Sequence, residues 1–191
     1  MMSGFNEDET LALARRLADA AWSAIRPHLR SGIAAENKGG GGVCYDPVTA
    51  ADKAAEEAIR AILAAERPDD GIDGEEFGRH EGTSGWIWYI DPIDGTRAFL
   101  AGLPVWTTLI ALVGPDETPL VGMIDQPVLG ERYVGSPAGS FLETASGRSA
   151  LNVSACSDLR EAIIATTDPF IMTPAEQGAW THLRHTARIN R

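Results

Sequence analysis

The chain has 191 residues, of which 44% are hydrophobic and 23% are charged, and this composition is typical of a globular protein that buries a core. Such a length fits one ordinary domain, or one domain and part of another. The formal net charge of −11 argues against non-specific nucleic-acid binding, which needs a basic surface to displace counterions from phosphate.

The first predicted elements are two helices separated by a glycine-rich loop. Residues 7–29 form an amphipathic helix, since their apolar residues recur at helical spacing. The four glycines at 39–42 suit neither helix nor strand and predict a flexible loop. A second helix begins after Thr49, which is its N-cap, while Asp52 completes a capping box. The Pro-Asp-Asp-Gly segment at 68–71 ends this helix.

From residue 86 onward the pattern becomes rich in β-forming residues. The predicted strands cover residues 86–90, 107–113, 120–126 and 132–135. Gly, Pro and Asp turns separate them, which predicts an antiparallel sheet. A short helix at 96–100 lies between the first two strands.

After residue 151 helix and strand alternate. A short helix begins at Ser157, a buried strand follows at 162–166, and Thr173 with Glu176 forms a capping box that opens another helix. This alternation indicates the beginning of an α/β unit.

We therefore predict an α+β domain, with an antiparallel sheet and two helices, over residues 1–150. Residues 151–191 form the incomplete start of an α/β domain. Because one strand and two helices cannot cover both faces of a parallel sheet, this second unit either packs on the first or belongs to a truncated chain.

The cysteines and the hydropathy pattern indicate the compartment. Cys44 and Cys156 are distant and form no CxxC pair, so a reducing cytosol is expected. No segment approaches the ~20 apolar residues that a membrane span needs. We expect a soluble cytoplasmic protein that binds neither membrane nor nucleic acid.

The acidic residues gather in three clusters that suggest a metal site. The clusters are Asp46 to Asp52, Gly74-Glu75-Glu76, and Asp91 to Asp94. An acidic site binds phosphate only where cations reverse the local charge, and Mg²⁺ prefers carboxylate, water and phosphate oxygens. Each cluster alone also has an ordinary explanation as a helix cap, a solvated loop or a turn.

The third cluster combines metal ligands with a phosphate-binding turn. Asp91 and Asp94 bracket Pro92 at the end of an apolar strand, so both can be aimed at one point, with the Ile93 carbonyl between them. Gly95 lets the chain turn into the helix at 96–100, whose free N–H groups suit a phosphate.

These three clusters carry a resemblance to a known family. Residues 88–96, WYIDPIDGT, nearly match the signature of the inositol-monophosphatase superfamily, and residues 46–52 and 74–76 resemble its other two motifs in the same order. Residues 96–110 and 125–132 resemble its histidinol-phosphate phosphatase branch. The resemblance implies a layered α/β sandwich of the inositol-monophosphatase type.

The resemblance also implies a role for each matching residue. The metal ligands are Glu75, Asp91, Asp94 and the Ile93 carbonyl, which hold two or three Mg²⁺ ions. The catalytic residues are Asp52, Thr96 and Glu75, with Asp52 and Thr96 pairing to activate the attacking water. Backbone N–H groups of Gly95 and Thr96 bind phosphate. Lys38, Glu76 and Arg97 correspond less directly to site residues of the family and are the remaining candidates.

The implied activity is Mg²⁺-dependent hydrolysis of a small phosphorylated alcohol by metal-activated water. Histidinol phosphate is the first-ranked substrate, and an inositol or sugar monophosphate is the alternative. The family takes a further aspartate ligand and much of its substrate pocket from a domain beyond the end of this chain. A third hypothesis is therefore a truncated relic that binds metal or phosphate without turnover, and a fourth is a plain structural module. Relatives are commonly dimers, so a homodimer is also expected.

Overall fold

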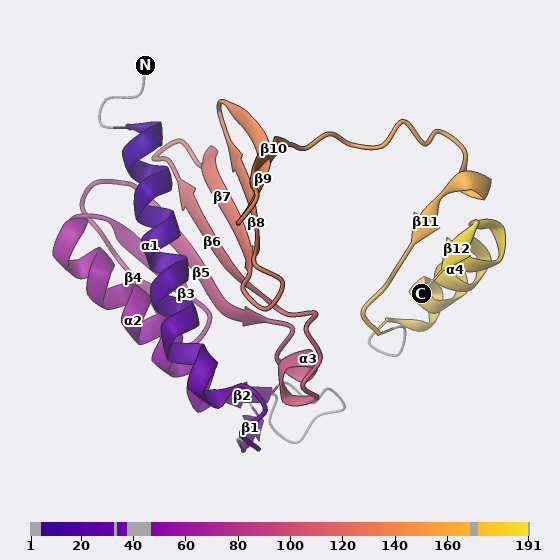
Figure 1. Cartoon of the computed structure of the whole chain (residues 1–191), viewed down its shortest axis with the longest axis horizontal. Helices are drawn as coiled ribbons and strands as arrows, with labels where there is room; N and C mark the ends of the chain where they lie inside the picture. The colour runs from indigo at the N-terminus through magenta and orange to yellow at the C-terminus, as the bar shows by residue number, and fades with distance from the viewer. Residues whose placement is uncertain (1–4, 33, 38–46, 169–171, 191) are drawn as a thin grey trace. The chain divides into compact units, whose positions relative to one another are not determined.

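The computed structural model describes residues 5–32, 34–37, 47–168 and 172–190 (Figure 1). The chain divides into two compact units, residues 1–151 and 152–191. Each unit is described by itself.

Two long helices open the first unit. The helical elements of this unit are α1 (Glu7–Ile25), the 3-10 turn η1 (Arg26–His28), α2 (Ala50–Glu66) and α3 (Thr96–Leu100). The Asn6 side chain caps α1 by accepting from the Glu9 N–H. Pro27 stands where the chain leaves the α-helix for η1, so α1 is shorter than the predicted helix at 7–29.

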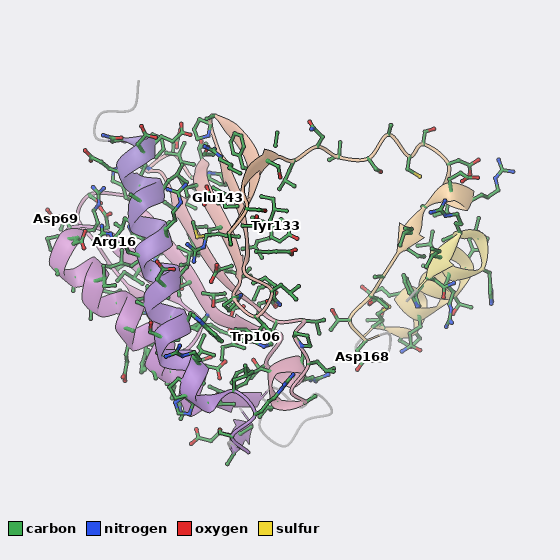
Figure 2. All side chains as sticks on the ribbon, in the orientation of Figure 1. Arg16, Asp69, Trp106, Tyr133, Glu143 and Asp168 are labelled. Carbon is green, nitrogen blue, oxygen red and sulfur yellow. The ribbon has the colours of Figure 1, made fainter. Side chains whose placement is uncertain are left out.

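The helices α1 and α2 lie side by side on one face of a large sheet (Figure 1). Small residues at the contact let the two backbones approach closely. The fully buried alanines are Ala14, Ala18 and Ala21 of α1 and Ala51 and Ala55 of α2. Arg16 pairs with Glu66 between the two helices (Figure 2).

The sheet contains eight strands among the described residues, in the order β10-β9-β8-β7-β6-β5-β3-β4. Its strands are β3 (Gly71–Gly74), β4 (Gly78–His80), β5 (Ile87–Asp94), β6 (Thr107–Val113), β7 (Pro119–Gln126), β8 (Glu131–Ser136), β9 (Gly139–Thr144) and β10 (Gly147–Ala150). A separate antiparallel pair joins β1 (Ala35–Asn37) to β2 (Pro47–Thr49). The strands β3 and β5 run parallel. The sheet is therefore mixed, whereas the sequence predicted an antiparallel sheet.

The two faces of the sheet have different environments. Alternate residues of the central strands face α1 and α2 and form the core. They include Trp88, Ile110, Val121, Met123 and Val134, all buried. The opposite face carries a hollow of about 840 Å³ lined by Tyr89, Leu109, Ile124, Tyr133 and Leu151. Figure 2 shows Tyr133 on the side of the sheet away from α1.

The second unit is a small α/β arrangement. It contains η2 (Leu159–Glu161), β11 (Ile163–Ile164), α4 (Pro174–Thr186) and β12 (Ile189–Asn190). Thr173 and Glu176 form the predicted capping box of α4, and β11 pairs parallel with β12. The prediction of a buried strand at 162–166 is wrong in its burial, since Ile163 is 65% exposed. A two-stranded ribbon cannot enclose its own side chains.

None of the helices in the described segments combines the length and the apolar character needed to cross a bilayer.

Candidate metal and phosphate site

A β-bulge at the end of β5 determines where two of the predicted ligands lie. Asp91 pairs with Leu109 of β6, but Asp94 pairs with Thr107, so β5 carries one extra residue between them. Residues three apart on a regular strand point to opposite faces. The extra residue returns Asp94 to the face of Asp91, which is the face with the hollow.

The hairpin between β3 and β4 brings Glu75 to the same place. Gly74 pairs with Ile90 across the parallel strands β3 and β5, and the Glu75 N–H donates to the Ile90 carbonyl at 3.1 Å. Glu75 therefore lies beside Asp91, although the two residues come from different strands. Both line the hollow on the open face of the sheet.

The carboxyl groups of this cluster repel one another. Burial, a hydrogen bond with Glu75 and the charges of Glu75 and Asp94 raise the pKa of Asp91 to about 8, although a hydrogen bond from the Ile93 backbone opposes the shift. A nearby cation favours the charged form of a carboxyl group. The electrostatics therefore favour a positively charged ligand.

The residues fit a hard divalent cation. Oδ1 of Asp91 is buried and has no hydrogen-bond partner among the residues that the structure describes, and a buried oxygen without a partner is costly. Carboxylate and carbonyl oxygens are the ligands that Mg²⁺ prefers. Among the residues that the structure describes, no group of three or more His, Cys, Asp or Glu side chains is arranged so that it could hold a metal ion.

Asp52 is held at the start of α2. It is 1% exposed, and its Oδ2 accepts from the backbone N–H of Thr49 at 2.8 Å as well as from the Thr49 hydroxyl. The capping box predicted from the sequence is therefore confirmed. The short helix α3, which begins at Thr96, lies against β2, the strand that leads into α2.

A glycine turn follows the bulge and leads into α3. Gly95 has a φ of 94°, in the left-handed region that favours glycine, and a Cβ there would come within 3.4 Å of Trp106. The Thr96 hydroxyl donates to the Ile93 carbonyl at 3.1 Å. The buried Thr108 hydroxyl donates to the Pro92 carbonyl at 2.8 Å and so fixes the bulge.

The remaining candidates differ in position. Glu76 lies next to Glu75 in the hairpin, and its backbone N–H donates to the Glu56 carboxylate at 2.7 Å. Arg97 is exposed on α3. Lys38 lies outside the described residues, as do Cys44 and Asp46, the first residue of the first motif.

Glu56 was not among the residues predicted from the sequence. It is fully buried on α2, four positions after Asp52. The available signal was a carboxylate within the apolar stripe that includes Ala55, Ile59 and Leu63, a face where an acidic side chain needs a partner.

The sequence matches a protein-family model over most of its length. The model of the inositol monophosphatase family matches residues 6–179. The chain belongs to the inositol monophosphatase family. The mixed α+β architecture agrees with this assignment, because the structure resembles an inositol monophosphatase from Zymomonas mobilis with a TM-score of 0.79 and 36% sequence identity. That match covers 97% of this chain and 69% of the other.

Similar proteins within the family carry different names. The chain is 34% identical to a protein of Arabidopsis thaliana named bifunctional phosphatase IMPL2, over 95% of this chain and 51% of that protein. It is 45% identical to a histidinol-phosphatase of Streptomyces coelicolor, over 65% of this chain and 47% of that protein. The chain thus spans about half the length of these curated relatives.

Proposed function

We propose that the protein is a Mg²⁺-dependent phosphate monoester hydrolase that acts on a small phosphorylated alcohol. The observation that carries the proposal is the convergence of Glu75, Asp91 and Asp94 on one face of the sheet through the bulge in β5 and the β3–β4 hairpin. The buried Asp91 oxygen without a hydrogen-bond partner in the described segments supports the same conclusion.

The metal ligands in this proposal are the carboxylates of Glu75, Asp91 and Asp94 and the Ile93 carbonyl, which hold two or three Mg²⁺ ions. Bound Mg²⁺ supplies charge for the phosphoryl oxygens and the leaving group and lowers the pKa of water. Because Glu75 and Asp91 are exposed to the hollow, a substrate phosphate can reach the same ions.

The other candidates position the reactants. Asp52, held by Thr49 at the start of α2, pairs with Thr96 to activate the attacking water. Backbone N–H groups of Gly95 and Thr96 donate to the phosphate. Holding water and phosphate in fixed positions reduces the entropy lost on the way to the transition state.

Histidinol phosphate is the substrate that we propose first. The chain shares 45% identity with the Streptomyces coelicolor histidinol-phosphatase, and its segment 96–110 resembles that branch. An inositol or sugar monophosphate is the alternative, favoured by similarity to a Caulobacter vibrioides inositol-1-monophosphatase at 37% identity over 68% of this chain.

We also propose that residues 1–150 carry the metal and phosphate site and that residues 151–191 begin a second domain. The structure separates compact units near that position, which supports the proposal. A homodimer stays a prediction, which sedimentation equilibrium would test.

Phosphate release from histidinol phosphate, inositol 1-phosphate and a hexose phosphate tests the activity. We expect release in the presence of Mg²⁺, its loss in EDTA, and the highest kcat/KM for histidinol phosphate. Release that EDTA leaves unchanged would overturn the proposal. Calorimetric Mg²⁺ binding without release from any substrate would favour the relic that only binds metal.

A further inference from the structure

The carboxylate of Glu56 lies behind the hairpin that carries Glu75. The Glu56 side chain is 0% exposed, which is rare for an acidic residue unless its oxygens are paired. Nothing in the proposed reaction requires Glu56 to touch metal, water or substrate. Its burial therefore needs another explanation.

Glu56 holds two successive N–H groups of the hairpin loop. Its Oε2 accepts from the Glu76 N–H at 2.7 Å, and its Oε1 accepts from the Phe77 N–H at 3.2 Å. Nε of Arg60 donates to Oε1 at 2.7 Å and neutralises the buried charge. Hydrogen bonds to an ionised acceptor are among the stronger ones in proteins.

Arg60 extends the clamp to the far side of the loop. Gly74 pairs with Gly78 at the start and end of the hairpin, so the connecting residues are Glu75, Glu76 and Phe77. The guanidinium of Arg60 also donates to the Gly78 carbonyl. Helix α2 thus holds the hairpin loop through the N–H groups of Glu76 and Phe77 and through the Gly78 carbonyl.

Gly74 makes this approach sterically feasible. A Cβ at Gly74 would lie 2.0 Å from Oε1 of Glu56, which is far inside any allowed contact. The carboxylate therefore lies in the space that a side chain at Gly74 would fill. The first residue of the Gly-Glu-Glu motif is explained by Glu56, not by a turn conformation.

The clamp fixes the backbone at Glu75 and at the two residues that follow it. The Glu75 N–H is bound to the Ile90 carbonyl of β5, and the next two amides are bound to Glu56, so successive backbone groups are fixed. A short loop without such contacts samples several conformations, and ordering it costs free energy when a metal binds. A loop whose backbone is already fixed avoids that cost.

We propose that Glu56 is a positioning residue that holds the β3–β4 hairpin so that the Glu75 carboxylate faces Asp91 and Mg²⁺. The inference rests on the proposed function, because it assigns Glu75 to the metal. It also states how a residue that contacts no ion controls the metal affinity, as supporting contacts around metal ligands do in other sites.

Two substitutions at Glu56 test the proposal in the 191-residue chain. Glu56→Gln replaces one acceptor oxygen by an NH₂ group that faces an N–H, and Glu56→Asp keeps the charge but withdraws it by one methylene. We expect each to weaken Mg²⁺ binding about 10–100-fold in calorimetric titration. Amide hydrogen exchange at Glu76 and Phe77 should quicken in metal-free buffer.

Glu57→Gln is the matched control, because it makes the same chemical change at the next position, where the side chain is exposed. It should leave both measurements at the wild-type values. Urea unfolding of every variant shows whether the chain remains cooperatively folded.

The outcomes separate the two claims. Mg²⁺ affinity that stays at the wild-type value in folded Glu56→Gln and Glu56→Asp chains overturns the positioning role alone. Loss of cooperative unfolding in both variants overturns it as well, because Glu56 would then support the fold in general. A wild-type chain that binds no Mg²⁺ overturns the proposed function together with the role of Glu56.

Discussion

Asp94 lies on the same face of the sheet as Asp91 because β5 carries one extra residue between them. A regular strand would send the two carboxylates to opposite faces. The bulge therefore converts two residues of one strand into neighbours, and the hairpin supplies Glu75 from the adjacent strand. One bulge and one hairpin loop thus bring the three proposed ligands to the same face of the sheet.

Thr108→Val should weaken this arrangement. The Thr108 hydroxyl is buried and donates to the Pro92 carbonyl within the bulge. Valine has nearly the same shape but leaves the carbonyl without this donor, which costs about 1–3 kcal/mol of the free energy of unfolding. Because Asp91 and Asp94 flank the bulge, Mg²⁺ affinity should fall about tenfold.

Urea unfolding and Mg²⁺ calorimetry measure the two effects of Thr108→Val separately. Thr108→Ser is the control, since it keeps the hydroxyl and removes only a methyl group. It should lose some stability but keep its Mg²⁺ affinity. Equal affinity in the valine and serine variants would contradict the role given to the bulge.

Local sequence signals predicted several elements with their boundaries. The helix at 96–100 and the strand at 107–113 agree with α3 and β6, and the capping box of Thr49 and Asp52 is present. These elements depend on residue type within a few positions. The bulge does not, because it exists only in the register between β5 and β6.

The parallel pairing of β3 with β5 and the strands β9 and β10 were not predicted. Glycine-rich, polar segments such as β10 (Gly147–Ala150), which is exposed throughout, carry little hydrophobic alternation. Pairing with neighbouring strands decides their structure. The clamp at Glu56 escaped prediction for a related reason, because its partners Glu76 and Phe77 lie some twenty positions away.

Asp94→Asn should separate metal affinity from the stability of the metal-free chain. Removing one charged ligand should weaken Mg²⁺ binding at least about tenfold. The same change removes repulsion from the half-buried Asp91, so the metal-free chain should unfold at a slightly higher urea concentration. Unfolding in EDTA and in Mg²⁺ gives both values.

Glu117→Gln is the control for Asp94→Asn, because Glu117 is exposed in the turn before β7 and lies outside the site. It should change neither measurement. A lower midpoint of Asp94→Asn in EDTA would show that Asp94 supports the metal-free fold and would contradict the predicted repulsion.

Gln126→Glu should loosen the two loops that the Gln126 side chain holds together. Nε2 of Gln126 donates to the carbonyls of Pro104 and Trp106, and its Oε1 accepts from the N–H groups of Val128 and Leu129. Glutamate keeps the acceptor but places a second oxygen against two carbonyls. The free energy of unfolding should fall by about 2–4 kcal/mol.

Thermal unfolding followed by circular dichroism measures the effect of Gln126→Glu. The loss should diminish at low pH, where a protonated glutamate can again donate to one of the carbonyls. A variant as stable as wild type at pH 7 would show that these four hydrogen bonds contribute little.

Glu143→Gln should produce a stability difference that depends on pH. Nε and Nη2 of Arg15 donate to the two oxygens of Glu143 at 2.9 and 2.7 Å and join α1 to β9. The hydrogen bonds with Arg15, together with its charge, lower the pKa of Glu143 below its usual value of 4.5. A carboxyl group with a lowered pKa in the folded state stabilises above its unfolded pKa, and this stabilisation disappears as the pH falls through the folded pKa. At pH 7 the variant should therefore lose about 1 kcal/mol of the free energy of unfolding, because the pair is partly exposed.

Urea unfolding at intervals from pH 7 to pH 3 should show the difference between Glu143→Gln and wild type shrinking below pH 4.5, whereas Glu57→Gln should match wild type throughout. A difference that stays constant down to pH 3 would mean that the packing of Glu143, and not its charge, joins the helix to the sheet.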